Sequence, residues 1–108
     1  MKQFEIYAAN LPHGSETGTY IVVLANGIVD NTIFCAPIMF GENDSDKNRF
    51  HFQANTKNGR AGTIIAEHMR NLEINRISGI VDEVTEKECQ YVKEKIAALY
   101  MSLSMGKV

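Results

Sequence analysis

The stretch Leu11–Ala25, LPHGSETGTYIVVLA, joins a loop to a buried strand and decides the fold of the chain. Its first part, Leu11 to Gly18, holds one proline and two glycines, which predicts a loop rather than a helix or a strand. Its second part, Tyr20 to Ala25, is an apolar, largely β-branched run, which is typical of a central strand. The stretch therefore predicts a β-rich core that is entered through an irregular loop.

Short alternating or β-branched segments continue on both sides of this strand. Turn-forming residues at Asn26-Gly27, Asp30-Asn31 and Asn55–Gly59 separate them, as does the polar stretch Gly41–Arg49. In the sequence Phe-His-Phe, the alternation places His51 on the wet face of a strand whose phenylalanines point inward. The predicted strands are Phe4–Asn10, Tyr20–Ala25, Thr32–Met39, Phe50–Phe52, Thr63–Met69 and Gly79–Val84.

The one long helix is predicted to begin at Thr85, because Thr85 and Glu88 form a capping-box pattern. Gly106 is suited to end it. The elements together predict a mainly β fold with a C-terminal α-helix, in which one domain over residues 1–108 forms a small, strongly bent antiparallel barrel. The apolar residues expected to face the core from the helix are Cys89, Val92, Ile96, Leu99, Tyr100 and Leu103.

Length and charge narrow the possible functions. A chain of 108 residues is the size of one domain, and its net charge of −2 argues against nonspecific binding to a polyanion. The N-terminus has no signal-peptide pattern, and the apolar runs are too short to span a membrane, so we expect a cytoplasmic protein. Cys35 and Cys89 lack metal-type spacing and are expected to be free thiols. No metal ion or other cofactor is expected.

Five segments in order resemble the PemK/MazF (Kid-like) toxins of type II toxin–antitoxin systems. They are KQFEIYAANL, with Phe4 where the family usually has glycine, then Gly14–Gly18, Tyr20–Leu24, Ala36–Met39, and Glu67–Glu73 with Arg76. The resemblance implies an SH3-like barrel of the PemK/MazF/CcdB type and a homodimer. It also implies a groove for single-stranded RNA, which in the family accepts the antitoxin's acidic tail, and endoribonuclease activity without a metal ion.

Two positions depart from the family in a way that matters for catalysis. The resemblance places Tyr20 and Met39 where the family carries a catalytic Arg and a Thr. An Arg offers two charged donors to one phosphate, whereas Tyr20 offers one neutral donor and Met39 offers none. Losing one such donor typically costs about a hundredfold to a thousandfold in rate. The sequence therefore predicts a weakened or rearranged active site.

Three residues are candidates for replacing the lost chemistry. His13 and His68 are suited to proton transfer near neutral pH, and Glu16 to orienting a histidine or acting as a base. Each residue also has a non-functional interpretation. His13, in a loop, is readily explained as a solvated side chain, and Arg70 is explained by an ion pair with Glu73. The residues expected to bind RNA or a partner are Ser15, Tyr20, Glu67 and Arg70.

Two functions stay open on these grounds. The first is a toxin-type, RNA-binding protein that acts as a sequence-specific endoribonuclease (an mRNA interferase) through a rearranged or weakened site. The second is a catalytically inactive relative that uses the same groove to bind an antitoxin-like acidic peptide, nucleic acid or another protein. The net charge and the two substitutions favour the second, and the retained Gly14–Glu16 and Glu67–Arg70 segments favour the first.

Overall fold

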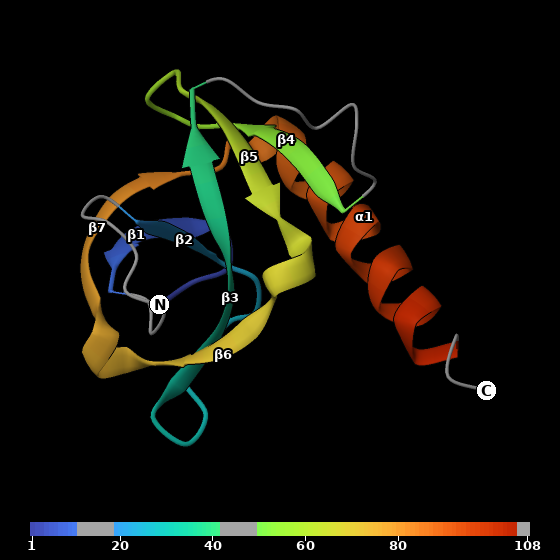
Figure 1. Ribbon diagram of the computed structural model, residues 1–108. Coiled ribbons are helices and arrows are strands. Elements are labelled where there is room, and N and C mark those ends of the chain that lie inside the picture. The colour runs from blue at the N-terminus through green and yellow to red at the C-terminus, as the bar shows by residue number, and fades with distance from the viewer. Residues whose placement is uncertain (11–18, 42–49, 106–108) are drawn as a thin grey trace.

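The computed structural model describes residues 1–10, 19–41 and 50–105, with side chains up to Leu99. In these ranges, seven strands precede one C-terminal helix (Figure 1). Two short 3-10 turns, η2 (Ala66–His68) and η3 (Ile74–Arg76), flank the sixth strand. The remaining elements are β1 (Glu5–Ala9), β2 (Tyr20–Val23), β3 (Thr32–Phe40), β4 (His51–Asn55), β5 (Ala61–Ile65), β6 (Arg70–Glu73), β7 (Ile77–Glu83) and α1 (Glu86–Met105).

All paired strands are antiparallel, in the order β4-β5-β3-β2-β1-β7, with β6 added beside β3. Strand β3 is long enough to pair with two different strands along its length. Its second half pairs with β5 (Ile38 opposite Ile64), and its first half pairs with β6 (Cys35 opposite Arg70). The turn η2 carries the chain from one of these partners to the other (Figure 1).

The sheet is strongly bent but open. Strands β4 and β7 lie at the two ends of the pairing order. An isolated bridge between Thr56 and Val84 links the chain just beyond these strands, and the backbone N–H of Lys57 donates to the carbonyl of Glu83 at 2.8 Å. The predicted fold class, mainly β with a C-terminal helix, is therefore confirmed, although full strand pairing does not close the sheet into a barrel.

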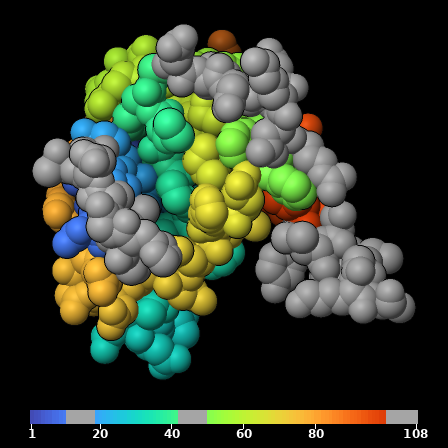
Figure 2. All heavy atoms as spheres, viewed as in Figure 1, coloured from blue at the N-terminus to red at the C-terminus, as the bar shows by residue number. Residues whose placement is uncertain are grey.

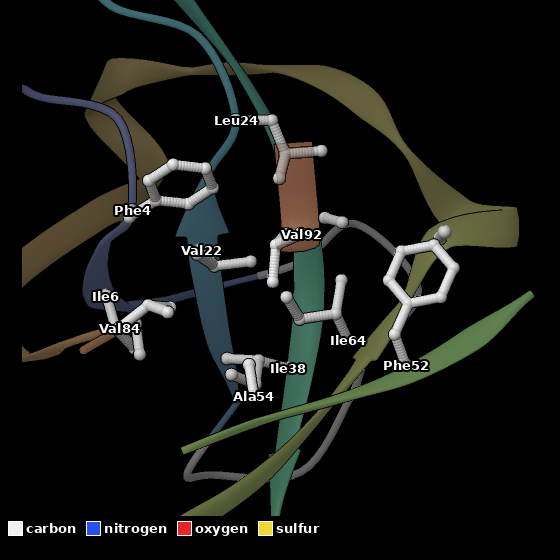
Figure 3. Packing of buried hydrophobic residues seen from close by; sticks show 12 residues of the cluster. Phe4, Ile6, Val22, Leu24, Ile38, Phe52, Ala54, Ile64, Val84 and Val92 are labelled. Atoms are coloured by element: carbon white, nitrogen blue, oxygen red, sulfur yellow. The ribbon is translucent and has the colours of Figure 1, made fainter. Parts of the chain in front are cut away.

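The central strands are buried on both faces, as the Tyr20–Ala25 run predicts. Val22 belongs to a large cluster on one face, whereas Ile21 and Val23 belong to a smaller cluster on the other. Val92 is the buried contribution of α1 to the large cluster, where it points between Leu24 and Ile64 (Figure 3). The smaller cluster consists of Ile21, Val23, Ile33, Cys35 and Leu72.

The helix begins where it was predicted, but its first turn is held differently. The carboxylate of Glu88 accepts a hydrogen bond from the backbone N–H of Asn55 at 2.8 Å and one from the hydroxyl of Thr85 at 3.3 Å. The N–H of Thr85 donates to the carbonyl of Asn55 instead of to Glu88. The predicted reciprocal capping box is therefore wrong, because Glu88 ties the helix to the end of β4.

The predicted core-facing stripe of the helix is confirmed for its first four residues. Cys89, Ile96 and Leu99 pack against the large cluster around Val92. The side chains of Tyr100 and Leu103, and the whole of Gly106, lie outside the described residues. Cys35 and Cys89 are free thiols, as expected. No helix in the described part of the chain is long and apolar enough to cross a membrane.

The prediction of one strand over Thr63–Met69 is wrong in its second half. Strand β5 ends at Ile65, and η2 then turns the chain so that β6 can pair with the first half of β3. Because Arg70 and Glu73 lie on this extended strand, the suggested ion pair between them does not form in the described structure. Glu73 pairs with Arg76 instead, at 3.6 Å.

Phe4 adopts a backbone conformation that normally favours glycine. Its φ angle is +73°, in the left-handed region that L-residues with a Cβ rarely enter. Two backbone hydrogen bonds hold it there, since its N–H donates to Val23 at 2.7 Å and its carbonyl accepts from Val84 at 3.0 Å. The side chain is only 5% exposed. Burial of the aromatic ring of Phe4 therefore offsets the strain of its backbone conformation.

Candidate functional site

The strand register separates Tyr20 and Met39, the two residues that the resemblance places at the catalytic positions. Tyr20 lies opposite Ile38, and its ring meets the ring of Phe40 edge-on at 5.3 Å between centroids, on the side of the large cluster. Met39 lies between Ile38 and Phe40 on β3, so its side chain points to the opposite face, where it is 57% exposed. Tyr20 and Met39 therefore do not form a joint donor site in this structure.

Met39 belongs to a row of side chains that crosses three strands. It lies opposite Thr63 on β5, and Thr63 in turn lies opposite Gln53 on β4. Met39 and Gln53 are exposed, whereas Thr63 between them is buried. Because strand side chains alternate, His51, two residues before Gln53, lies on this same face. We call Met39, Thr63 and Gln53 the Met39 row.

A carboxylate lies between two imidazoles near the start of β4. The Nε2 atom of His51 is 2.8 Å from Oε1 of Glu67, and the Nε2 atom of His68 is 3.9 Å from Oε2 of the same carboxylate. His51 is 14% exposed and His68 is 59% exposed. Figure 2 shows this segment, from the end of β5 through η2 (yellow), at the surface between β3 (teal) and β4 (green).

The sequence predicted only part of this arrangement. Glu67 was expected to bind RNA or a partner, and its close neighbour is His51, which alternation had placed on the wet face of its strand. Nothing in the local sequence pairs residues 51 and 67, because the contact is made by the pairing of β4 with β5 and the turn η2 that follows. The predicted candidate His68 is the more exposed of the two histidines.

Arg70 begins β6 directly after this cluster and is half-buried. It lies opposite Cys35, and burial raises the pKa of the Cys35 thiol to about 11, an effect that the nearby positive charge of Arg70 partly opposes. Four residues of extended β3 separate Cys35 from Met39, which corresponds to roughly 13 Å. Arg70 on β6 and the Met39 row are therefore paired with different parts of β3 and do not lie opposite each other.

Three predicted site residues cannot be placed. His13, Ser15 and Glu16 belong to the loop Leu11–Gly18, which lies outside the described residues. Their proposed roles therefore stay predictions. Among the described residues, no group of three or more His, Cys, Asp or Glu side chains is arranged to hold a metal ion.

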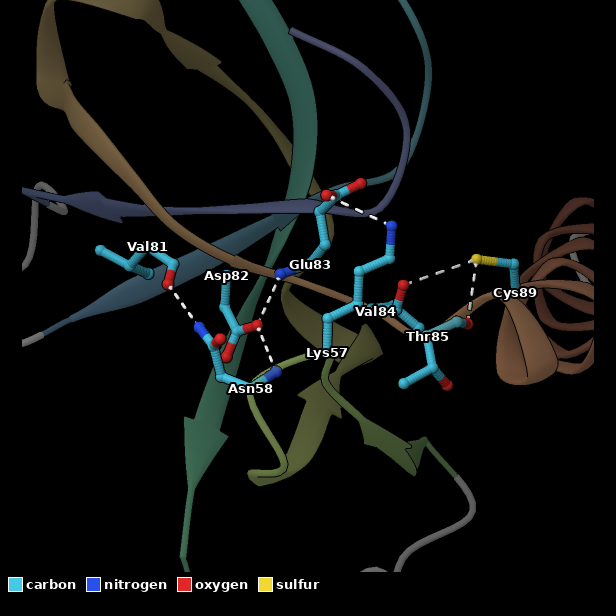
Figure 4. Close-up of polar contacts among 8 residues, drawn as sticks. All are labelled: Lys57, Asn58, Val81, Asp82, Glu83, Val84, Thr85 and Cys89. Carbon is cyan, nitrogen blue, oxygen red and sulfur yellow. Dashed lines mark hydrogen bonds and ion pairs between the residues drawn. The ribbon is translucent and has the colours of Figure 1, made fainter.

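A second ionic cluster lies at the opposite end of the sheet, around Asp82 of β7 (Figure 4). Oδ1 of Asp82 accepts hydrogen bonds from the backbone N–H of Glu83 at 2.8 Å and of Asn58 at 3.3 Å. Oδ2 lies 3.2 Å from Nε of Arg60 but accepts no hydrogen bond, so this contact is electrostatic. The side chain is fully buried.

The pKa of Asp82 reflects opposing influences. Burial alone disfavours the charged carboxylate and raises its pKa, but a hydrogen bond from Thr56, the two backbone N–H groups and the charge of Arg60 together lower the pKa below its ordinary value. The cluster holds the β4–β5 turn against β7, where the open ends of the sheet approach each other. Its polar groups serve the fold.

The described structure is a small antiparallel β domain with one C-terminal helix and an exposed imidazole–carboxylate cluster. The family model for the PemK-like, MazF-like toxin of type II toxin–antitoxin systems matches residues 2–100. The chain belongs to this family, and the resemblance inferred from its sequence is confirmed. It is a toxin-type protein, for which partnership with an antitoxin or a second copy is the general rule of the class. A search of curated proteins finds no match.

Proposed function

We propose that this chain binds single-stranded RNA and cleaves it slowly, without a metal ion, through a rearranged active site centred on His68. The observation that carries the proposal is the position of Glu67, which His51 holds at 2.8 Å and which lies 3.9 Å from the exposed imidazole of His68. A carboxylate beside an imidazole stabilises the protonated ring that forms when the ring acts as a base.

The chemistry needs one proton acceptor and one charged donor. The Nε2 or Nδ1 atom of His68 takes the proton of a ribose 2′-hydroxyl, and the 2′-oxygen then forms a bond to its own phosphorus. The bond from phosphorus to the 5′-oxygen breaks, and that oxygen takes a proton from solvent. The products are a 2′,3′-cyclic phosphate and a 5′-hydroxyl end. Arg70, two residues after His68, is the charged donor for the phosphate oxygens.

His51 has a positioning role in this scheme. It fixes the carboxylate of Glu67 but does not itself touch the RNA. The predicted rate is low, because Met39 supplies no donor and Tyr20 packs on the other face of the sheet. Each donor missing from such a site costs about a hundredfold or more.

The proposal also includes a cytoplasmic location and a homodimer. The free thiols support the location, and the class of the protein supports the homodimer.

The test is cleavage of a mixed-sequence RNA in EDTA by the purified full chain, with mapping of the RNA ends. The wild type should produce cyclic phosphate ends slowly. His68→Ala should lower the rate by about a hundredfold, which is the lower end of general acid–base contributions. Gln90→Ala, an exposed change on α1, is the matched control and should cleave like the wild type. Equal rates for His68→Ala and Gln90→Ala would disprove the role of His68.

The placement of Met39 and Tyr20 favours a second function, that of an inactive relative. A face that exposes a thioether where charge must be stabilised is better suited to holding a partner than to catalysis. In that case, no EDTA-resistant cleavage appears. An acidic, antitoxin-like peptide then binds with an affinity that falls in Arg70→Ala and in high salt. Sedimentation of the free chain at micromolar concentration tests the proposed homodimer in either case.

A further inference from the structure

One hydroxyl group in the described structure is buried without any hydrogen-bond partner. Thr63 lies in the middle of β5 and is only 3% exposed, and its Oγ1 atom neither donates nor accepts a hydrogen bond. Folded proteins pair nearly all of their buried polar side chains, so an unpaired one needs an explanation.

The fold itself does not need this hydroxyl. Thr63 is followed by Ile64 and Ile65, and both of these are buried. A valine has the same branched shape, suits a strand equally well and buries no polar atom. The oxygen of Thr63 therefore contributes nothing visible to the folded chain and is available to a bound molecule.

The side chains next to Thr63 on the neighbouring strands are flexible. Its two cross-strand neighbours in the Met39 row, Met39 and Gln53, are both exposed. Directly opposite residues on paired strands have Cβ atoms about 5 Å apart, so these side chains lie within reach of the hydroxyl. Methionine is unbranched and has three rotatable bonds. The Met39 side chain can therefore change its rotamer beside Thr63 while the backbone of β3 keeps its place.

We propose that the Thr63 hydroxyl donates a hydrogen bond to a phosphodiester oxygen of bound single-stranded RNA when the Met39 side chain turns aside. This inference rests on the proposed function, which supplies the RNA. Met39 acts as the cover of the site, and Thr63 as a binding residue that the free protein conceals. Met39 lies on β3 and Thr63 on β5, and the antiparallel pairing of these two strands fixes the position of the Thr63 backbone.

The experiment measures the affinity of the full chain for a fluorescent 2′-O-methyl RNA strand, which cannot be cleaved, by anisotropy at one fixed salt concentration. Thr63→Val should weaken binding about tenfold, since a lost hydrogen bond to a charged group is worth at least that much. Thr63→Ser keeps the hydroxyl and should bind within about twofold of the wild type. Met39→Ala should bind at least as tightly as the wild type. Ser78→Ala, which removes an exposed hydroxyl on β7, is the control.

Two further measurements keep the outcomes distinct. Without RNA, Thr63→Val should melt at the same temperature as the wild type or higher, and a clear fall in melting temperature would overturn the proposal by giving the hydroxyl a structural role. On an abasic strand of equal length, the tenfold loss should persist, and its disappearance would overturn the phosphate contact in favour of a base contact.

Equal binding by Thr63→Val and the wild type would overturn this inference alone and leave the proposed function intact. Absence of any RNA binding by the wild type would overturn both.

Discussion

The carboxylates Asp82 and Glu67 both lie beside histidine or arginine side chains, yet they differ in almost everything else. Asp82 is fully buried, is bound by backbone N–H groups and Arg60, and joins two ends of the sheet. Glu67 is 40% exposed and lies between two histidines on a surface turn. The comparison teaches that burial, rather than residue type, separates a charge that maintains the fold from one that a ligand can use.

The energetic expectation differs accordingly. Removing a buried carboxylate leaves its hydrogen-bond donors without an acceptor and typically costs about 1–3 kcal/mol. Removing one member of an exposed pair typically costs about 0–1 kcal/mol. If the comparison is right, mutations at the two carboxylates should separate stability from function.

Of the two carboxylates, Asp82 is expected to give the larger effect on stability, in the change Asp82→Ala. This change leaves Arg60 and two backbone N–H groups without their acceptor at the junction of β7 and the β4–β5 turn. Because Arg60 is 41% exposed and stays solvated, the main loss is the acceptor of the two backbone N–H groups, and the free energy of unfolding should fall by about 2–3 kcal/mol in urea denaturation. RNA affinity per folded molecule should not change. A loss of stability below about 1 kcal/mol would show that the buried cluster is not what holds the open ends of the sheet.

A related test concerns Phe4, whose carbonyl accepts from Val84 close to the same junction. Phe4→Ala removes the buried ring but keeps the strained backbone, and it should cost about 3–5 kcal/mol. Phe4→Gly removes the same ring but relieves the strain, because glycine tolerates a positive φ.

The glycine variant should therefore be more stable than the alanine variant by about 1 kcal/mol, in thermal or urea unfolding. The opposite order, with alanine more stable, would show that the positive φ at residue 4 is not strained. At this position, where the resemblance implies a glycine in the family, Phe4 has a positive φ and adds an aromatic ring to the core.

Much of the fold follows from local patterns. The β-branched run before Ala25, the alternation around His51 and the apolar stripe beginning at Cys89 each predicted the correct element, because each pattern records which side chains face the core. The break after Ile65 was missed, since it depends on the length of β3 and not on residues 66–69 themselves.

The site was harder to predict than the fold. The His51–Glu67 contact joins residues 16 positions apart, and the opposite orientations of Tyr20 and Met39 depend on the register of β2 on β3. The capping pattern at Thr85 was misleading, because the Glu88 carboxylate accepts a hydrogen bond from the backbone N–H of Asn55 and not from that of Thr85. Contacts between distant segments need the topology, and no local pattern contains it.

The pH dependence of stability gives a smaller, sharper test of Asp82. Its pKa is lowered in the folded protein, so the unfolded chain binds a proton more readily. The stabilisation is fully present above the unfolded pKa of about 3.9 and is lost as the pH falls through the lower folded pKa. Urea unfolding at several pH values should show a constant difference between wild type and Asp82→Asn above about pH 5.

Below about pH 4 that difference should shrink, because the Asp82 carboxylate of the unfolded wild type takes up a proton before that of the folded protein. A difference that grows in acid would contradict the direction of the pKa shift. Lys57→Met is a suitable control, because the Lys57–Glu83 pair lies close to Asp82 but its side chains are 47% and 42% exposed.

The smallest effect on stability is expected for Glu67→Gln. Because the carboxylate is 40% exposed, the change should alter the free energy of unfolding by less than about 1 kcal/mol. Under the proposed function, the same change removes the charge that stabilises protonated His68, and RNA cleavage in EDTA should fall about tenfold, which corresponds to about 1.4 kcal/mol of the barrier. His51→Gln retains a hydrogen-bonding side chain and should cause a smaller loss, since it alters only the position of Glu67. If Glu67→Gln destabilises the protein as much as Asp82→Ala does, the two carboxylates have the same structural role, and the distinction between a buried clamp and an available charge fails.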